Sequence, residues 1–324
     1  MSSEGRRFIV VGGAGFIGSH VVERLLRTGA ALVTVYDNFS SGRMWHLQHG
    51  RIEPKLKVFR GEVADLPLLT KAMKGHDTAI HLASNPDIAK AATEPDIDFY
   101  HGTLLTQQVL EAMRQSKVRR LWYASGSGVY GERGDTPLRE DDGPLAPIST
   151  YGASKLAGEG LIASYCAMFG MTAQAFRFGN VVGPRQTHGV GLDFLRRLRK
   201  DRERLRILGD GSQSKPYIHV SDAVQAMLLA DEKAVSGFEV YNVATEDGLR
   251  VDEIARLALR CVAVEGTVRL EYTGGDRGWK GDVPVVRLRT EKIRALGWQP
   301  GLGSREAMER ALTEMHKDER HFWM

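Results

Sequence analysis

The stretch that decides the fold is Arg7-Phe8-Ile9-Val10-Val11-Gly12-Gly13-Ala14-Gly15-Phe16-Ile17-Gly18. Its first five residues are mostly β-branched or aromatic, which predicts a short buried strand. Apolar residues then recur at helical spacing as far as Arg27, and Thr28-Gly29 predicts the end of a helix. Between a strand and a helix, a G-x-G-x-x-G turn lets the backbone approach a diphosphate, which binds the free N–H groups of the helix. The stretch therefore predicts a dinucleotide site.

A second predicted strand, 31–36, leads into Asp37. Asp37 follows Gly18 at about the 20-residue distance expected for a carboxylate that accepts hydrogen bonds from the adenosine ribose. A carboxylate would repel a 2′-phosphate, so we expect NAD rather than NADP. The alternative, an ordinary turn residue before Asn38, is disfavoured by the matching strand–turn–helix context.

Composition indicates a globular protein that is large enough for about two domains. The chain has 324 residues, 42% of them hydrophobic and 26% charged. Its two cysteines, Cys166 and Cys261, lack the spacing of a metal site, which predicts no metal and a reducing compartment. Neither a signal peptide nor an apolar run of membrane-spanning length is evident, so we expect a cytoplasmic protein that does not bind membranes.

A basic run at 196–206 accounts for part of the net charge of +4. It can be a solvated helix face or a site for a polyanion. The first is favoured because no aromatic residues interleave with the arginines, as a surface that binds single-stranded nucleic acid would need. We therefore expect no nucleic-acid partner.

Strands and helices alternate along the first half of the chain. Further strands are predicted at 56–60, 78–83, 118–124 and 172–178, and further helices at 66–74, 95–115 and 151–169. This order predicts an α/β fold, a Rossmann-type parallel sheet with helices on both faces. The second half mixes short strands near 205–208, 217–220, 239–243 and 268–272 with helices near 191–200, 221–232, 251–261, 290–296 and 304–318. We expect an NAD-binding domain at 1–180, with returns near 215–245, and a smaller, partly interleaved substrate domain at 181–324.

Tyr151 and Lys155 lie four residues apart in a predicted helix and so share one face of it. To act as a base at neutral pH, a tyrosine needs its pKa lowered by roughly three units, about 4 kcal/mol. A lysine ammonium one turn away and an oxidised nicotinamide ring would supply the positive field. The alternative, two unrelated surface residues, is disfavoured behind a dinucleotide motif.

With these residues in place, nearly the whole chain resembles the extended short-chain dehydrogenase/reductase family. Within it the resemblance is to nucleotide-sugar 4-epimerases such as UDP-glucose 4-epimerase, including the UDP-glucuronate 4-epimerase branch. The motifs that carry it are Gly12-Gly13-Ala14-Gly15-Phe16-Ile17-Gly18, Asp37-Asn38, His81-Leu82-Ala83, Val129-Tyr130-Gly131, Tyr151-x-x-x-Lys155, Asn180-x-x-Gly183-Pro184-Arg185 and Tyr217-Ile218-His219-Val220.

The resemblance implies a UDP-sugar substrate, NAD as the cofactor and a homodimer. Tyr151 would remove the proton of the sugar 4-hydroxyl while C4 passes a hydride to NAD, and the hydride would return to the other face of the 4-keto sugar. Lys155 would bind the nicotinamide ribose and lower the pKa of Tyr151.

The resemblance also assigns site residues. Those expected to bind NAD are Gly12, Gly15, Phe16, Ile17, Gly18, Asp37, Asn38, Ser40, Ser41, Gly42, Glu62, Val63, Leu82, Ala83, Ser84, Tyr151, Lys155, Phe178 and Val181. Those expected to bind substrate are Ser125, Gly126, Ser127, Asn180, Arg185, Thr187, Lys215 and Arg277.

The chain departs from the family pattern at three positions. Gly126 stands where the family has a serine or threonine that hydrogen-bonds the sugar 4-hydroxyl, so Ser125 or Ser127 must take that catalytic role. Lys215 stands near the place of a common arginine, which keeps the charge without the bidentate fork. Glu62 stands in place of an aspartate.

Two other functions compete with epimerisation. Related 4,6-dehydratases and decarboxylases carry a carboxylate just before the Val-Tyr-Gly motif, where this chain has Gly126-Ser127-Gly128. Glycine cannot serve as a general acid or base, so these reactions are disfavoured. A non-catalytic NAD-binding scaffold is disfavoured because both Tyr151 and Lys155 are present.

Overall fold

The computed structural model describes residues 3–50, 54–85, 87–233, 237–264 and 266–322. Its centre is a seven-stranded sheet in which every neighbouring pair is parallel. From one edge to the other the strands are β11 (Phe238–Val243), β6 (Thr172–Phe178), β5 (Arg120–Gly126), β4 (Thr78–His81), β1 (Arg7–Val11), β2 (Leu32–Asp37) and β3 (Leu56–Arg60).

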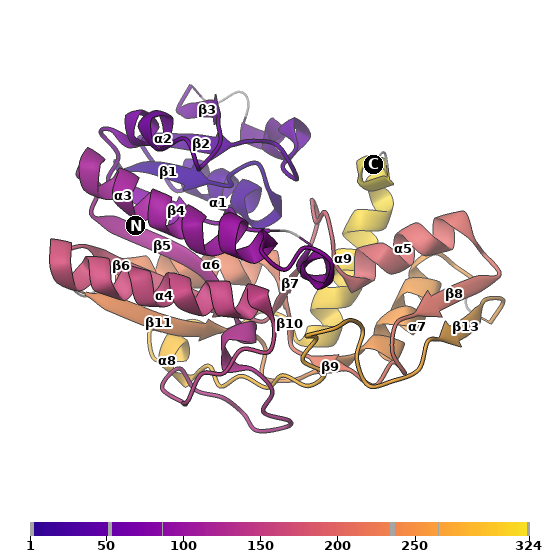
Figure 1. The fold of residues 1–324 in the computed structure, drawn as a ribbon. Coiled ribbons are helices and arrows are strands. Elements are labelled where there is room, and N and C mark those ends of the chain that lie inside the picture. The colour runs from indigo at the N-terminus through magenta and orange to yellow at the C-terminus, as the bar shows by residue number, and fades with distance from the viewer. Residues whose placement is uncertain (1–2, 51–53, 86, 234–236, 265, 323–324) are drawn as a thin grey trace.

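Helices cover both faces of this sheet (Figure 1). Side chains alternate along β1, so that Phe8 and Val10 face one core while Ile9 and Val11 face the other. The first core is closed by α1 (Phe16–Arg27), α6 (Val220–Glu232) and α8 (Glu291–Arg294). The second is closed by α2 (Leu66–Met73), α3 (Leu104–Ser116) and α4 (Thr150–Phe169). The predicted α/β fold with a doubly covered parallel sheet is confirmed.

A smaller part with its own hydrophobic core lies beside the sheet, at the right of Figure 1. Its strands are β7 (Asn180–Val182), β8 (Arg204–Ile207), β9 (Ser214–Lys215), β10 (Tyr217–His219), β12 (Leu249–Arg250) and β13 (Arg269–Tyr272). Its helices are α5 (Val190–Lys200), α7 (Val251–Cys261) and α9 (Ser304–Lys317). Because α6 and β11 return to the large sheet between these elements, the two parts are interleaved. The boundary at residue 180 stays a prediction.

Short helical segments complete the fold, and one of them changes a predicted helix. They are η1 (Met44–Gly50), η2 (Ile88–Ala92), η3 (Phe99–Thr103), η4 (Ser127–Tyr130) and η5 (Glu319–Phe322). The helix predicted at 95–115 begins as the π-helical segment η3 and continues as α3. Gly102 permits close packing there, because a Cβ on it would lie 2.6 Å from Ser154 Oγ on α4. The segment before α3 is thereby held against α4.

Among the described helices, none is both long and apolar enough to cross a membrane. The described residues also contain no group of three or more metal-ligating side chains.

Candidate active site

The glycine turn lies where the strand order reverses between β1 and β4, at the carboxyl ends of both strands. Ligands of open α/β sheets bind in this crevice. Gly12 has φ +83°, and a Cβ on it would lie 2.6 Å from the backbone nitrogen of Ala83. A Cβ on Gly18 would lie 2.2 Å from the Gly12 carbonyl oxygen. Glycine is therefore required for this turn to reach both the end of β4 and the start of α1.

The start of α1 is free to bind an anion. Its N-cap residue, Gly15, has no side chain with which to cap the helix, so N–H groups at the positive end of the helix remain available. This geometry fits the predicted diphosphate site.

Asp37 lies buried at the end of β2, beside the glycine turn. Its Oδ2 accepts a hydrogen bond from Ala14 N at 2.9 Å and its Oδ1 accepts one from Phe39 N at 2.8 Å. Burial raises the pKa of this carboxyl, and the two N–H groups act against that rise. Each oxygen keeps a second lone pair with which it can accept from a ribose hydroxyl.

Two further predicted cofactor residues meet beside Asp37. Asn38 Nδ2 donates to Glu62 Oε2 at 3.0 Å, and Asn38 Oδ1 accepts from the backbone and hydroxyl of Ser40. Across the crevice, Ser84 Oγ is buried and its hydroxyl lies near the Tyr151 phenol. An uncapped helix start and a buried carboxylate whose oxygens can each accept another hydrogen bond together fit NAD.

The Tyr151–Lys155 pair lies on the first turns of α4, which begins where Ser149 Oγ accepts from Gly152 N. Lys155 Nζ donates to the Ala124 carbonyl oxygen at 2.8 Å and lies 5.4 Å from the centroid of the Tyr151 ring. The helix therefore places the cation next to the phenol, at the carboxyl end of β5.

Burial dominates the electrostatics of this pair. It raises the pKa of Tyr151 to about 12; the Asp98 carboxylate adds to the rise and the Ser84 hydroxyl opposes it. Burial also lowers the pKa of Lys155 to about 8, and Asp98 opposes that change. At pH 7 the lysine is thus still mostly an ammonium, whereas the tyrosine is a neutral phenol.

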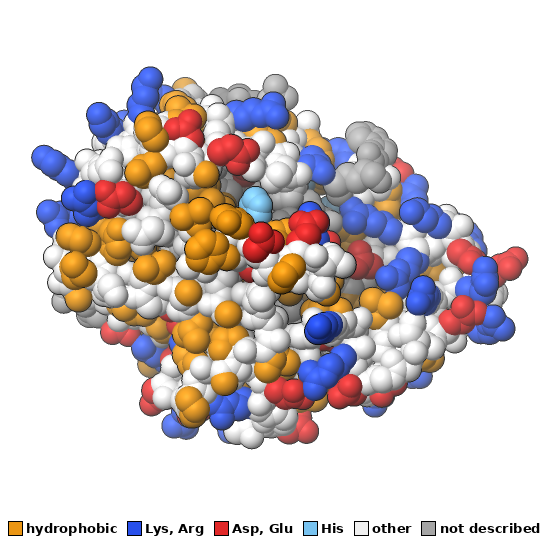
Figure 2. Space-filling view, in the orientation of Figure 1, with side chains coloured by type: hydrophobic (Ala, Val, Ile, Leu, Met, Phe, Trp, Pro, Cys, Tyr) orange, Lys and Arg blue, Asp and Glu red, His pale blue; other side chains and the backbone are white. Residues whose placement is uncertain are grey.

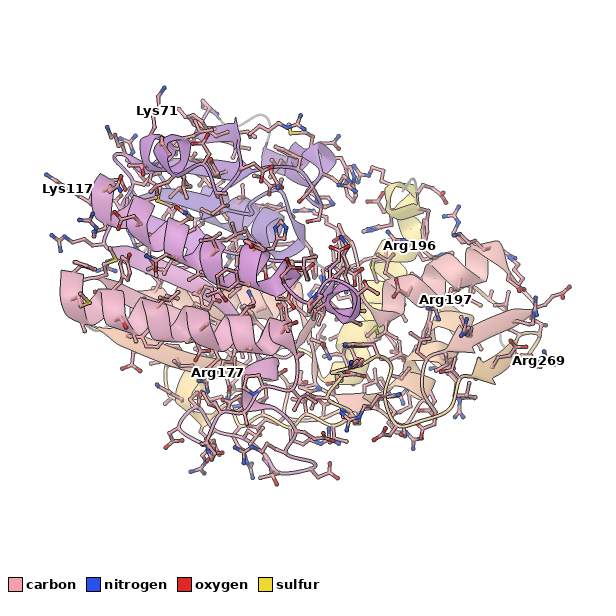
Figure 3. The ribbon with its side chains drawn as sticks, in the orientation of Figure 1. Lys71, Lys117, Arg177, Arg196, Arg197 and Arg269 are labelled. Atoms are coloured by element: carbon pink, nitrogen blue, oxygen red, sulfur yellow. The ribbon has the colours of Figure 1, made fainter. Side chains whose placement is uncertain are left out.

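The structure separates the two candidate serines. Ser125 is buried in β5, and its Oγ donates to Glu159 Oε1 at 2.6 Å. The same carboxylate accepts from Arg177 at 3.0 and 2.7 Å, and Arg177 lies beneath α4 (Figure 3). The Ser125 hydroxyl is thus engaged with a buried ion pair beneath α4, which disfavours the predicted place for it in the sugar site.

Ser127 is the remaining candidate. It begins η4, is half-buried, and its hydroxyl has no hydrogen-bond partner in the part of the chain that the structure describes. A Cβ on Gly152 would lie 2.5 Å from the Gly128 carbonyl oxygen, so η4 packs directly on the first turn of α4. Ser127 is consequently beside the turn that carries Tyr151.

Gly126 is not a packing requirement. A Cβ built on it meets no heavy atom within 4 Å, and its φ of −159° is ordinary extended backbone. At this position, where the family pattern has a serine or threonine, the end of β5 therefore has open space instead of a side chain.

The structure brings Lys215 and Arg277 together around Asp282. Lys215 Nζ lies 2.5 Å from Asp282 Oδ1, and Arg277 donates to the Asp282 carbonyl oxygen at 2.7 Å and to both oxygens of Glu132 at 2.9 Å. A Cβ on Gly281 would lie 3.2 Å from a backbone oxygen just before α4, so this loop packs next to the Tyr151 turn. Both predicted substrate cations thus lie on one side of the candidate site.

Arg185 is engaged in contacts within the chain. Its backbone has φ +66°, its side chain is buried, and Nη2 lies 2.5 Å from Glu23 Oε2 on α1. Its backbone nitrogen donates to His321 Nε2 at 3.2 Å. The guanidinium joins α1 to the loop after β7 through Nη2, and its predicted contact with the diphosphate stays a prediction.

The other two predicted substrate residues, Asn180 and Thr187, lie on β7 and in the loop before α5. Asn180 is exposed on β7, and none of the described residues hydrogen-bonds its side chain. Thr187 Oγ1 lies 3.2 Å from His188 Nδ1, and the Thr187 carbonyl oxygen accepts from Arg196.

The basic run is largely paired within the chain. Arg196 and Arg197 project from α5 (Figure 3). Arg196 is half-buried and also donates to the His321 carbonyl oxygen at 3.3 Å, while Arg199 pairs with Glu319 at 2.8 Å. The expected helix face exists, but Arg196 is a packing residue rather than a solvated one.

Sequence reasoning missed several polar residues that support the site. These are Asn85, Asp98, Glu159, Arg177 and Asp282. Glu159 could have been found from its position four residues after Lys155, on the same face of the helix. Asp98 lies in an irregular segment and gave no periodic signal.

Comparisons with known proteins agree with this site. Residues 8–244 match the model of the NAD dependent epimerase/dehydratase family. UDP-glucose 4-epimerase of Mycolicibacterium smegmatis is 31% identical over 94% of this chain and 97% of its own. A crystal structure of UDP-galactose 4-epimerase is 36% identical, with a TM-score of 0.85, over 96% of this chain and 99% of its own.

A dehydratase is similar as well. DesIV, the dTDP-glucose 4,6-dehydratase of Streptomyces venezuelae, solved with NAD bound, has a TM-score of 0.88 and 25% identity over 98% of this chain and 99% of its own. The family description and this structure both name NAD, the cofactor that the crevice fits. The chain belongs to the NAD dependent epimerase/dehydratase family, within the extended short-chain dehydrogenase/reductase fold.

Proposed function

We propose that the protein epimerises a UDP-hexose at C4, with NAD as its cofactor, in the cytoplasm. The substrate pair is UDP-glucose and UDP-galactose, or UDP-glucuronate and UDP-galacturonate. The observation that carries the proposal is Lys155 Nζ, held by the Ala124 carbonyl 5.4 Å from the Tyr151 ring at the end of β5. This is an acid–base pair next to a crevice that fits a dinucleotide.

In the proposed reaction, Tyr151 takes the proton of the sugar 4-hydroxyl and later returns it. Lys155 stabilises the phenolate with its positive charge, and Ser127 donates a hydrogen bond to the sugar 4-oxygen. NAD supplies reversible hydride acceptance when it is bound. Lys215 and Arg277 hold the nucleotide diphosphate, with Asp282 fixing both side chains.

The structure offers little support for the competing reactions. Elimination of water or carbon dioxide needs an additional acid or base at the sugar. Residues 126–128 carry no carboxylate, and the Glu159 carboxylate beneath them is paired with Arg177. A non-catalytic scaffold would have no use for a buried Tyr–Lys pair.

We further propose a homodimer formed through α3 and α4. The outward face of α4 carries small residues (Ala153, Ala157 and Gly160), and Met168 near its end is 72% exposed. Figure 2 shows apolar side chains gathered over these helices. Sedimentation at micromolar protein should give the mass of two chains, and Met168→Glu should shift it to one.

The test of the activity is incubation with UDP-glucose, UDP-galactose, UDP-glucuronate and UDP-N-acetylglucosamine, with and without added NAD. We expect one sugar to yield its C4 epimer with unchanged mass, read by proton NMR and mass spectrometry. Tyr151→Phe should lower the rate by roughly 10²–10⁴-fold. Tyr272→Phe, at a half-exposed tyrosine of β13 in the smaller part, is the matched control. Loss of water or carbon dioxide from the product, or full activity in Tyr151→Phe, would contradict the proposal.

A further inference from the structure

Asp98 is a buried carboxylate, 1% exposed, just before η3. Its Oδ1 accepts a hydrogen bond from Asn85 Nδ2 at 2.9 Å, and its Oδ2 accepts one from Thr150 Oγ1 at 2.7 Å. Asn85 follows the end of β4, next to Ser84, and Thr150 is the first residue of α4, next to Tyr151. One carboxylate therefore joins the loop beside the cofactor crevice to the turn that carries the candidate base.

The environment of Asp98 is unusual for a buried acid. None of the described residues forms an ion pair with it within 4.0 Å, and its two side-chain donors are neutral. A buried charge without a cationic partner is costly, so its stabilisation must come from these hydrogen bonds and from more distant charges. The nearby cation is Lys155, whose pKa Asp98 raises.

The groups that face this position come from the elements packed around it. Tyr151 and Lys155 lie near it on α4, and Asn85 contacts it from the loop after β4. Ser84 and Tyr123 lie near Tyr151, from that loop and from β5. Asp98 raises the pKa of both Tyr151 and Lys155. Its charge thus favours the protonated phenol and the ammonium together.

We propose that Asp98 is a positioning residue of the active site, whose carboxylate fixes the Thr150–Tyr151 turn against the Ser84–Asn85 loop and places a negative charge beside the Tyr151–Lys155 pair. The inference rests on the proposed function for its effect on turnover. Asp98 acts through the two residues that it hydrogen-bonds, Thr150 and Asn85.

The test separates the charge of Asp98 from its hydrogen bonds. Asp98→Asn removes the charge, and Thr150→Val removes one hydrogen bond while leaving the charge. The matched control is Asp96→Asn, at an exposed acid two residues away on the same segment. The readouts are the pH dependence of kcat, KM for the UDP-sugar, and the ultraviolet titration of the Tyr151 phenol, taken as the difference from Tyr151→Phe.

We expect Asp98→Asn to move the phenol titration to lower pH by on the order of one unit and the alkaline limb of kcat to lower pH as well, because both groups lose a negative neighbour. Its kcat should fall about 10–100-fold with KM nearly unchanged, because an amide loses the charge and also replaces one of the two acceptor oxygens that hold the Thr150–Tyr151 turn, while the nucleotide contacts stay. Thr150→Val should lower kcat without moving the titration, and Asp96→Asn should change neither.

An unmoved phenol titration in folded Asp98→Asn, checked by circular dichroism, would overturn the proposal. An unchanged kcat in Thr150→Val would also overturn the proposal. This second variant keeps the proposal testable if Asp98→Asn does not fold. The phenol titration needs no substrate, so absence of turnover in the wild-type protein would refute the proposed function while leaving the electrostatic part of this inference testable.

Discussion

The buried pair of Glu159 and Arg177 beneath the site allows a sharp test of how the β5 end is supported. The two side chains are 5% and 4% exposed and are joined by hydrogen bonds of 2.7 and 3.0 Å. Glu159 also accepts from Ser125, and the Arg177 guanidinium lies 4.8 Å from the centroid of the Tyr130 ring. The pair thus connects β5, α4, β6 and η4.

Removing one partner should cost far more than removing both. In the wild-type protein, burial acts to lower the pKa of Arg177, but the Glu159 carboxylate outweighs that effect and the pKa is raised. Glu159→Gln removes this partner and leaves the arginine charge buried. Breaking a buried pair on one side costs about 3–5 kcal/mol, because the remaining charge is uncompensated. Replacing both residues with apolar ones of similar volume, Glu159→Leu with Arg177→Met, removes both charges and should recover much of that cost.

The assay is urea unfolding of Glu159→Leu, of Arg177→Met and of the variant that carries both, with the free energy of unfolding compared in a double-mutant cycle. We expect the single-variant losses to sum to at least about 2 kcal/mol more than the loss in the double variant. Simple additivity of the losses would refute the reasoning, because it would mean that the two charges do not depend on each other. The exposed pair Arg114–Glu111 is the control and should give about 0.5 kcal/mol or less.

Three further predictions concern the glycine turn, acid stability and the C-terminal segment. Gly12→Ala should destabilise the protein by about 2–4 kcal/mol and weaken NAD binding, because Gly12 has a positive φ and a Cβ there would contact the backbone after β4. Gly126→Ala, where a Cβ meets open space, should be within about 1 kcal/mol of wild type in thermal unfolding. Equal losses of stability would be inconsistent with the geometry. Burial lowers the pKa of His46 to about 4 and that of His81 to about 3, so the unfolded chain binds more protons than the folded chain below the unfolded value of 6.5. The free energy of unfolding should therefore decrease as the pH is lowered, by about 1.4 kcal/mol per histidine at pH 5.5. A flat pH profile in denaturant titrations would argue against this. His321 is fully buried, and its ring centroid lies 5.5 Å from that of Trp45. His321→Ala should therefore lower the free energy of unfolding in urea by about 2 kcal/mol and loosen the loop after β7. Unchanged stability would exclude this contact as a support.

The regular elements were predictable because local pattern and tertiary burial agree in them. The strands 56–60 and 172–178 and the helix 251–261 lie at the residues that the sequence predicted. The strands β7, β9 and β12 were not predicted, since two or three residues are too few to show a period. The π-helical start of the α3 segment depends on packing of Gly102 against α4, which no local pattern reports.

The site was predictable where chemistry is tied to spacing and unpredictable where it depends on side-chain direction. Tyr151 and Lys155 share a helix face whatever surrounds them. Ser125 and Ser127 are both candidates from the sequence, and the pleat of β5 together with the Glu159 partner of Ser125 favours Ser127. Arg185 matched a motif, but its pairing with Glu23 joins residues far apart in the sequence.

The acid–base pair connects the sequence argument to the structure most directly. From the ordinary pKa of tyrosine, a shift of roughly three units makes the phenol half-ionised at pH 7. In this structure the pKa of Tyr151 is about 12, so a shift of about five units is needed, about 7 kcal/mol.

Lys155 alone does not supply this stabilisation, because its ammonium already lies within 5.4 Å of the ring in the arrangement that gives the raised value. The remainder must come with ligands, from the positive nicotinamide and from the hydrogen bond to the sugar hydroxyl. We therefore expect the ultraviolet titration of the Tyr151 phenol to move several pH units lower when NAD is added to the cofactor-free protein. A titration that does not respond to NAD would mean that Tyr151 cannot serve as the base.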